Sequence, residues 1–176
     1  MEKIAIFGSA FNPPSLGHKS VIDSLAHFDK ILLVPSIAHA WGKEMLDFDT
    51  RCQLVNAFIS DLSLDQVELS LIEKSLFTPG ESVTTYAVLS ELQKLYRDAE
   101  LTFVIGPDNF LKFSSFYKSD EITKQWSVMS CPEKVKIRST AIRLALQNGT
   151  DVAKLSTKSV TKILQDSELY TIMKIH

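Results

Sequence analysis

Short apolar, β-branched runs alternate along the chain with longer segments in which apolar residues recur at helical spacing. The short runs predict strands at Lys3–Phe7, Ile31–Val34, Gln66–Ile72, Leu101–Ile105 and Trp126–Ser130. The second and fourth runs are almost continuously apolar, which is typical of strands buried on both faces of a parallel sheet. The pattern therefore predicts a parallel sheet at the centre of the fold.

The segments between the strands carry apolar stripes and predict helices at Gly17–Phe28, Arg51–Leu62 and Val83–Tyr96. Strands that alternate with helices favour an α/β fold, here a Rossmann-like three-layer domain on a parallel sheet. We expect one domain over residues 1–176, because no repeat or linker interrupts the sequence, and a loop at Ala38–Thr50. In such sheets ligands bind beyond the carboxyl ends of the strands, so the site is expected there.

Composition and charge narrow the classes of protein. The net charge of −2 gives no overall attraction to nucleic acid or to an anionic membrane. No apolar run reaches the roughly 18–20 residues that a membrane span needs, and the first residues lack the pattern of a signal peptide. Cys52 and Cys131 lie in unrelated contexts and are expected to be reduced and partly buried. We therefore expect a cytoplasmic protein without nucleic-acid or membrane partners; its composition is compatible with a homo-oligomer.

A loop rich in glycine and proline follows the first predicted strand. It reads Gly8-Ser9-Ala10-Phe11-Asn12-Pro13-Pro14-Ser15-Leu16-Gly17-His18. Gly8 allows the backbone to approach a ligand closely, and Gly17 and His18 open a helix whose free N–H groups favour an anion. His18 can donate a charged hydrogen bond to a phosphate there. A plain strand-to-helix turn is the alternative, but the loop matches neither the P-loop nor the GxGxxG pattern of dehydrogenases.

The loop resembles the G-G-x-F-[DN]-P-x-H-x-G-H motif of the HxGH nucleotidyltransferase superfamily, which also follows the first strand. One departure matters most: Ser15 stands where the motif has its first histidine. The resemblance implies that His18 is catalytic and that the loop binds ATP. The ATP-binding residues implied in it are Gly8, Ser9, Ala10, Phe11, Ser15, Gly17 and His18.

A second landmark is the segment Phe103–Phe110, in which an apolar run ends in Gly106 and is followed by Asp108. Asp108 can cap the next helix, or its carboxylate can accept from a ribose hydroxyl or a purine amine. The segment is similar to the superfamily motif F-[IV]-I-G-x-D-x-[LF]. This similarity implies that Gly106 and Asp108 contact ATP.

A third landmark, Lys136–Arg143, begins a predicted helix in which Ser139 and Thr140 are candidates for the capping residue. It resembles the superfamily motif I-S-S-T-x-[IV]-R, with Arg138 in place of the first serine. The resemblance implies that Arg138, Ser139, Thr140 and Arg143 bind the triphosphate and that Arg143 is also catalytic. From the residues alone, the segment is equally a capped helix with a solvated basic face.

The C-terminal segment and the loop after the second strand are most similar to the nicotinate-mononucleotide branch of the superfamily. In that branch a lysine and an arginine follow the second strand, and Lys43 and Arg51 are their counterparts here. An aromatic residue contacts the pyridine ring, and Phe116 or Tyr117 fits that position. The mononucleotide-binding residues implied by the resemblance are Asn12, Lys43, Thr84 and Phe116.

The resemblance implies an adenylyltransferase that joins the AMP part of ATP to nicotinate or nicotinamide mononucleotide and releases pyrophosphate, in NAD biosynthesis. Mg²⁺ would accompany ATP, held by phosphate oxygens and water. His27 and His39 have no partners at metal-binding spacing, so no metal site of the protein's own is expected. Two alternatives stay open: a nucleotide-binding or regulatory protein that lost activity with the first motif histidine, and a phosphopantetheine adenylyltransferase-like enzyme.

Overall fold

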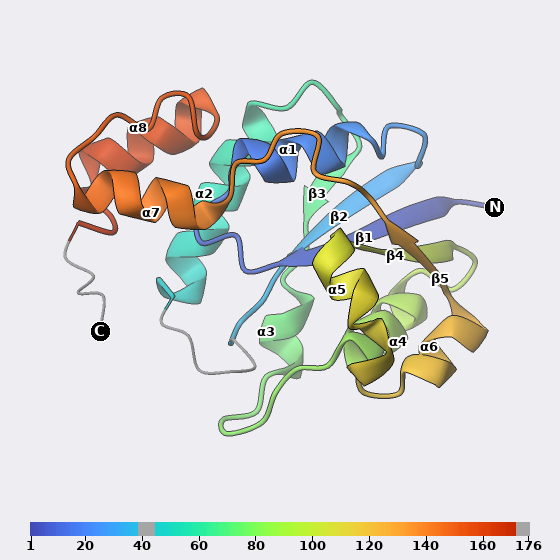
Figure 1. Ribbon diagram of the computed structural model, residues 1–176. Coiled ribbons are helices and arrows are strands. Elements are labelled where there is room, and N and C mark those ends of the chain that lie inside the picture. The colour runs from blue at the N-terminus through green and yellow to red at the C-terminus, as the bar shows by residue number, and fades with distance from the viewer. Residues whose placement is uncertain (39–44, 172–176) are drawn as a thin grey trace.

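The computed structural model describes residues 1–38 and 45–171 (Figure 1). Its sheet has five parallel strands in the order β3-β2-β1-β4-β5. The strands are β1 (Lys3–Ser9), β2 (Lys30–Pro35), β3 (Val67–Leu69), β4 (Glu100–Ile105) and β5 (Ser127–Ser130). The chain adds strands on one side of β1 and then returns to its other side, so the strand order reverses between β1 and β4. Ligands bind at such a reversal, beyond the carboxyl ends of the strands.

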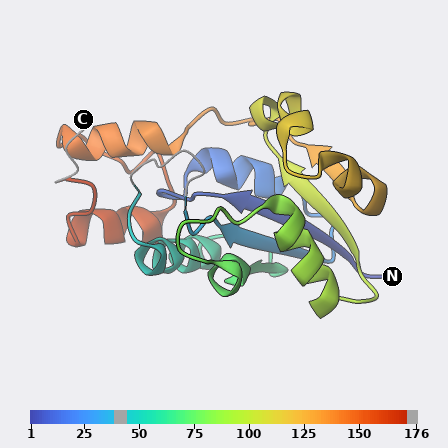
Figure 2. The ribbon, with the colours of Figure 1, turned by 90° about the horizontal axis from the view of Figure 1, so that it is seen from below.

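Helices cover both faces of the sheet, as Figure 2 shows, and the predicted three-layer α/β fold is confirmed. Consecutive side chains of β1 point to opposite faces: Ala5 and Phe7 to one core cluster, Ile4 and Ile6 to the other. The first cluster includes residues of α1, α2, α7 and α8, and the second includes residues of α4 and α6. The helices are α1 (Leu16–Asp23), α2 (Phe48–Ser60), α3 (Ile72–Leu76), α4 (Thr85–Leu95), α5 (Pro107–Leu111), α6 (Ser119–Gln125), α7 (Ser139–Gln147) and α8 (Lys158–Asp166), with a 3₁₀ turn at Phe113–Ser115.

The continuous apolar runs in the sequence correspond to strands that are buried along almost their whole length. Only the first residue of β2 and of β4 escapes full burial. Burying each large aliphatic side chain contributes roughly 1.5–3 kcal/mol, so these strands anchor the core. Within the described ranges, no helix has both the length and the apolar character that crossing a membrane requires.

Three predictions of local structure are wrong. The expected helix Gly17–Phe28 ends earlier than predicted, since α1 ends at Asp23 and turns follow. The expected strand Gln66–Ile72 is limited to Val67–Leu69, because β3 is an edge strand that pairs with β2 alone, and α3 begins at Ile72. The expected loop Ala38–Thr50 ends earlier than predicted, since α2 begins at Phe48. The side chain of Asp47 accepts from the backbone N–H of Thr50 at 2.9 Å and so caps α2.

Candidate active site

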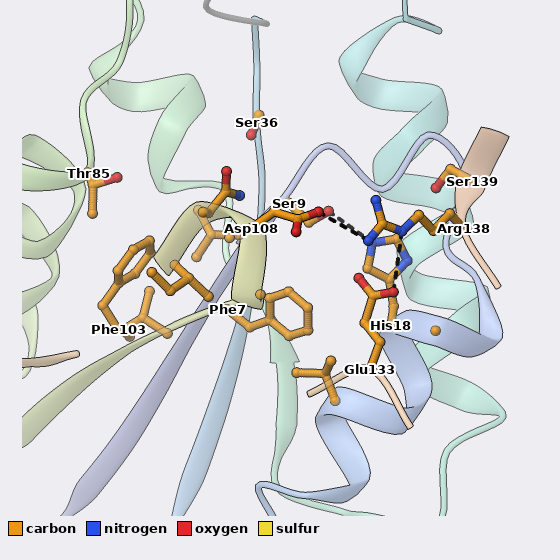
Figure 3. Close-up of a pocket in the computed structure, with 18 of the residues that line it drawn as sticks. Phe7, Ser9, His18, Ser36, Thr85, Phe103, Asp108, Glu133, Arg138 and Ser139 are labelled. Carbon is orange, nitrogen blue, oxygen red and sulfur yellow. Dashed lines mark hydrogen bonds and ion pairs between the residues drawn. The ribbon is translucent and has the colours of Figure 1, made fainter. Parts of the chain in front are cut away.

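A cavity of about 590 Å³ lies at the carboxyl ends of β1 and β4, where the strand order reverses. Figure 3 shows His18, Arg138 and Ser139 on one side of it and Phe103 and Thr85 on the other. The first side is polar and joins the starts of α1 and α7, whereas the second is largely apolar and faces α4. The position agrees with the expectation that chemistry lies in the loops after the strands.

The loop between β1 and α1 is held by hydrogen bonds to its carbonyl groups. Pro13 and Pro14 have no N–H, so their carbonyl oxygens are the backbone groups that need partners. The donors come from α2, from α7 and from the segment before α8, all distant in sequence. The bonds are Arg51 Nη1 to Ala10 at 2.8 Å, Arg143 Nη1 to Asn12 at 2.8 Å, Ser139 Oγ to Pro13 at 2.6 Å and Ser156 Oγ to Pro14 at 2.7 Å.

The starts of α1 and α7 lie side by side, as Figure 1 shows. The backbone N–H of Gly17 donates to the carbonyl of Ile137 at 3.2 Å. A Cβ at position 17 would overlap that carbonyl oxygen, so Gly17 permits this approach. Glycine is therefore required at this position for packing against the chain before α7.

The expectation of free N–H groups at the start of α1 is wrong. The N–H groups of Leu16 and Gly17 donate to the carbonyls of Leu155 and Ile137, and that of His18 donates to Ser15 Oγ at 3.3 Å. The prediction that Ser139 or Thr140 caps α7 is wrong as well. The N-cap position of α7 is Arg138, and no side chain of the described residues caps the first turn. It is α7, therefore, that presents an uncapped N-terminus to an anion.

His18 is fixed on both ring nitrogens. The backbone N–H of Ser15 donates to Nδ1 at 3.0 Å, so the proton of the neutral imidazole is on Nε2, which donates to Ser9 Oγ at 2.9 Å. The rings of Phe7 and Phe11 pack beside the imidazole, with centroids at 6.0 and 4.7 Å. Burial lowers the pKa of His18 from 6.5 to about 4. The expectation of a charged donor is thus corrected: in the free protein at pH 7, His18 is a neutral donor.

Among the described residues, Arg138 is the only lysine or arginine that lines the cavity. Its Nη2 contacts Asp108 Oδ2 at 3.2 Å, and its Nε contacts Glu133 Oε2 at 3.4 Å. The hydrogen bond that the guanidinium donates to Asp108 raises the pKa of Arg138 above its ordinary value. Asp108 does not cap α5, because the N-cap is Gly106 and no side-chain bond is made there. The ion pairs thus link the starts of α5 and α7 across the mouth of the cavity.

Most of the residues assigned to ATP from the sequence line this one cavity. They come from three segments far apart in the chain, which the fold brings together, and Phe116 lines it too. Their contacts with nucleotide stay predictions. The residues concerned are Gly8, Ser9, Ser15, Gly17, His18, Gly106, Asp108, Arg138, Ser139, Thr140 and Phe116.

Five assigned residues of the described part do not line the cavity. Ala10 uses its carbonyl to accept from Arg51, and Phe11 is fully buried behind His18. Asn12 is also buried, and its Oδ1 accepts from the Tyr170 hydroxyl at 2.6 Å. The remaining two also have local partners: Thr84 caps α4 through the N–H of Ala87, and Arg143 donates to Asn12 and Thr140.

Of the two basic residues expected after the second strand, Arg51 has its partners within the protein. Arg51 is only 1% exposed, and its guanidinium donates to the carbonyls of Leu46, Ala10 and Ser36. Arg51 therefore links the loops after β1 and β2 to the residues before α2. This structural role accounts for an arginine at this position. Lys43 and His39 lie outside the described residues.

Several cavity residues were not identified from the sequence: Ser36, Glu73, Thr85, Phe103 and Glu133. Ser36 directly follows β2. It could have been predicted from the rule that ligands bind beyond the carboxyl ends of the strands. Glu73 is on α3, a helix that the sequence pattern did not predict, so no sequence feature pointed to it. Its Oε1 accepts from the N–H of Ile37 at 3.2 Å, and burial raises its pKa from 4.5 to about 7.

Cys52 and Cys131 are buried and unpaired, as expected. The described ranges contain no cluster of three or more His, Cys, Asp or Glu side chains suited to hold a metal ion. The two carboxylates at the mouth, Asp108 and Glu133, both contact Arg138. Among the described residues, then, these two carboxylates form ion pairs with Arg138 and are not part of a metal-binding cluster.

Residues 6–157 match the model of the cytidylyltransferase-like family. A solved structure from Vibrio parahaemolyticus, assigned as a nicotinate-nucleotide adenylyltransferase, is 54% identical, covers 98% of both chains and has a TM-score of 0.88. A relative from Borrelia garinii subsp. bavariensis with the same assignment is 27% identical over 191 residues, covering 96% of this chain and 94% of the relative. The nicotinic acid mononucleotide adenylyltransferase of Plasmodium falciparum, solved with NaAD, has the same fold: TM-score 0.77, 18% identity, over 97% of this chain and 98% of that one. The resemblance to the nicotinate branch of the HxGH superfamily is thus confirmed.

Proposed function

Since this chain belongs to the cytidylyltransferase-like family, we propose that it is an adenylyltransferase of NAD biosynthesis. It joins the AMP part of ATP to nicotinate mononucleotide, or to its nicotinamide analogue, and releases pyrophosphate. The observation that carries the proposal is the cavity at the strand reversal, where His18 and the uncapped start of α7 meet on one side. The names of the similar proteins support the choice of acceptor.

The reaction is an in-line displacement at phosphorus. An oxygen of the acceptor's 5′-phosphate forms a bond to the α-phosphorus of ATP, and the bond from that phosphorus to the oxygen shared with the β-phosphate breaks. Pyrophosphate leaves with the electron pair. In such transfers the protein mainly positions the reactants and neutralises developing charge, so no nucleophilic side chain is required.

The polar side of the cavity supplies what the leaving pyrophosphate needs. The uncapped N–H groups of Ser139 and Thr140 and the helix dipole of α7 favour an anion. His18 adds an N–H donor at Nε2, and Arg138 adds a full positive charge when its contacts with Asp108 and Glu133 are exchanged for phosphate. Asp108, freed by that exchange, accepts from a ribose hydroxyl.

The apolar side of the cavity suits the flat ring of a pyridine mononucleotide. Phe103 and Phe116 lie with ring centroids 6.5 Å apart in an edge-to-face arrangement, and both line the cavity. Thr85, at the start of α4, supplies a hydroxyl beside them. Mg²⁺ arrives with ATP as part of the substrate complex, and the protein holds it through the phosphates.

The proposal is tested by incubating the purified protein with ATP and Mg²⁺ and, in separate reactions, nicotinate mononucleotide, nicotinamide mononucleotide or 4′-phosphopantetheine. We expect pyrophosphate and dinucleotide in equal amounts, with a pyridine mononucleotide only. His18→Ala should abolish most of this activity, and His27→Ala, which changes an exposed histidine after α1, should retain it.

Two other outcomes would contradict the proposal. If ATP binds but no acceptor yields pyrophosphate, the chain is a nucleotide-binding protein that lacks turnover. If only 4′-phosphopantetheine yields pyrophosphate, the acceptor assignment is wrong although the reaction class is right.

A further inference from the structure

Two serines that depart from the superfamily motif both contact His18. Ser15 replaces the first motif histidine, and Ser9 stands where the motif has its second glycine. Ser9 Oγ lies 2.9 Å from His18 Nε2, and the backbone N–H and the Oγ of Ser15 lie 3.0 and 3.1 Å from Nδ1. The two departures are thus joined through a single imidazole, and all three residues line the cavity; Figure 3 labels Ser9 and His18.

The hydrogen bonds of the Ser9 hydroxyl leave its proton available. A hydroxyl has one donor and two acceptor positions. Ser9 Oγ accepts from His18 Nε2 and, at 3.5 Å, from the backbone N–H of Phe11. Within the part of the chain that the structure describes, no group accepts the Ser9 proton. The Ser9 hydroxyl can therefore still donate one hydrogen bond, and Ser9 lines the cavity.

The direction of the Ser9–His18 bond excludes a role for Ser9 as an activated nucleophile. A general base must present an unprotonated nitrogen to the hydroxyl that it deprotonates. His18 presents Nε2–H to Ser9, because Nδ1 already accepts from the Ser15 backbone. His18 therefore withdraws electron density from Ser9 Oγ and makes its hydroxyl a better donor.

We propose that the Ser9 hydroxyl donates a hydrogen bond to the polyphosphate of ATP and so replaces the donor that was lost with the first motif histidine. The inference rests on the proposed function for the identity of the nucleotide, but the chemistry that it requires is a phosphate chain. Ser15 acts through His18: it is the positioning residue whose backbone N–H keeps the proton of His18 on Nε2. In that complex the Nε2–H of His18 is shared between Ser9 Oγ and a phosphate oxygen, so both side chains donate to the phosphates beside the start of α7.

The test is binding of inorganic tripolyphosphate, measured by calorimetry at pH 7.5, to the wild-type protein and to Ser9 variants. Ser9→Ala should weaken binding about 10-fold, as expected for loss of one hydrogen bond to a charged group. Ser9→Thr, which keeps the hydroxyl on an extended strand, should restore affinity to within about threefold of wild type. Ser9→Gly, which restores the motif residue, should bind as weakly as Ser9→Ala. Ser60→Ala, at the end of α2, is the matched control and should bind like wild type.

A second measurement separates phosphate donation from mere packing. The ¹⁵N shifts of His18 in Ser9→Ala should still show the Nε2-protonated form, because the bond from Ser15 is unchanged. Equal tripolyphosphate affinity in wild type and Ser9→Ala would overturn the proposal, as would a failure of wild type to bind or of folded Ser9→Thr to recover. If binding depends on Ser9 but no acceptor gives pyrophosphate, the proposed function fails and the role of Ser9 stands.

Discussion

The hydroxyl of Ser139 donates a 2.6 Å hydrogen bond to the carbonyl oxygen of Pro13, across 126 residues of sequence. This bond joins the first residue of α7 to the loop that leads into α1. It explains why the hydroxyl does not cap its own helix, and why the N-terminus of α7 stays open beside His18. The phosphate side of the cavity therefore depends on how closely these two segments approach.

The variant Gly17→Ala tests how closely the start of α1 and the chain before α7 approach each other. The added Cβ would overlap the carbonyl oxygen of Ile137, so the two segments must separate. We expect a loss of about 2–3 kcal/mol in the free energy of unfolding, together with weaker ATP binding. Gly106→Ala is the matched control for stability, because its Cβ would meet no atom within 4 Å and its φ of −73° suits alanine. Equal stability of the two variants, measured by denaturant titration, would contradict the packing described.

His18 should titrate far below an ordinary histidine. Its pKa is lowered to about 4 by burial, whereas the unfolded chain has the usual value of about 6.5. The unfolded state therefore binds the proton first, and the contribution of His18 to stability is lost as the pH falls from 6.5 to 4. NMR titration of the free protein checks the value, and tripolyphosphate should raise it, because an anion favours the charged imidazole. A pKa of 6.5 or higher in the free protein would show that the site is more open to water.

Glu73 should have the opposite effect on stability in nearly the same pH range. Burial raises its pKa to about 7 in the folded state, against 4.5 when unfolded, so its contribution falls as the pH rises from 4.5 to 7. Glu73→Gln keeps an acceptor for the N–H of Ile37 and removes the titration. Relative to wild type, the variant should gain about 3 kcal/mol between pH 4.5 and 7.5 in unfolding experiments. A constant difference across this range would contradict the raised pKa.

Arg138→Ser restores the residue of the motif and removes a positive charge at the mouth of the cavity. Stability should change by less than about 1 kcal/mol, since the ion pairs with Asp108 and Glu133 are exposed to solvent. If Arg138 supplies charge to the transition state, kcat should fall roughly 10²-fold while the KM for ATP changes little. Arg97→Ser, at an exposed position outside the cavity lining, is the control. An equal loss in kcat and ATP affinity would indicate a role in binding alone.

The fold and the place of the site could be predicted from local patterns. Runs such as Ile31–Val34 indicated buried parallel strands, and the resemblance of three motifs, two after strands and one at a helix start, implied most of the residues that the cavity brings together. The hydrogen-bond partners of those residues could not be predicted. The N–H groups of Leu16 and Gly17 donate to the carbonyls of Leu155 and Ile137, which are more than a hundred residues away in the sequence.

The electrostatics of the site also depend on tertiary packing. From the sequence, a histidine at a helix start is expected to be a charged donor. His18, however, packs beside Phe7 and Phe11, and burial keeps its imidazole neutral. The resemblance implied a ligand contact for Arg51, but the structure gives its guanidinium four carbonyl partners in the protein. In both cases the deciding neighbours come from other segments of the chain.

The most direct test of the account is a crystal structure of the protein with α,β-methylene-ATP, which cannot transfer its adenylyl group. We predict that the β- and γ-phosphate oxygens lie within hydrogen-bond distance of His18 Nε2 and of the backbone N–H groups of Ser139 and Thr140. The N–H of Gly17 should stay on the carbonyl of Ile137. A triphosphate bound elsewhere, or one that leaves the start of α7 and His18 without contact, would contradict the account.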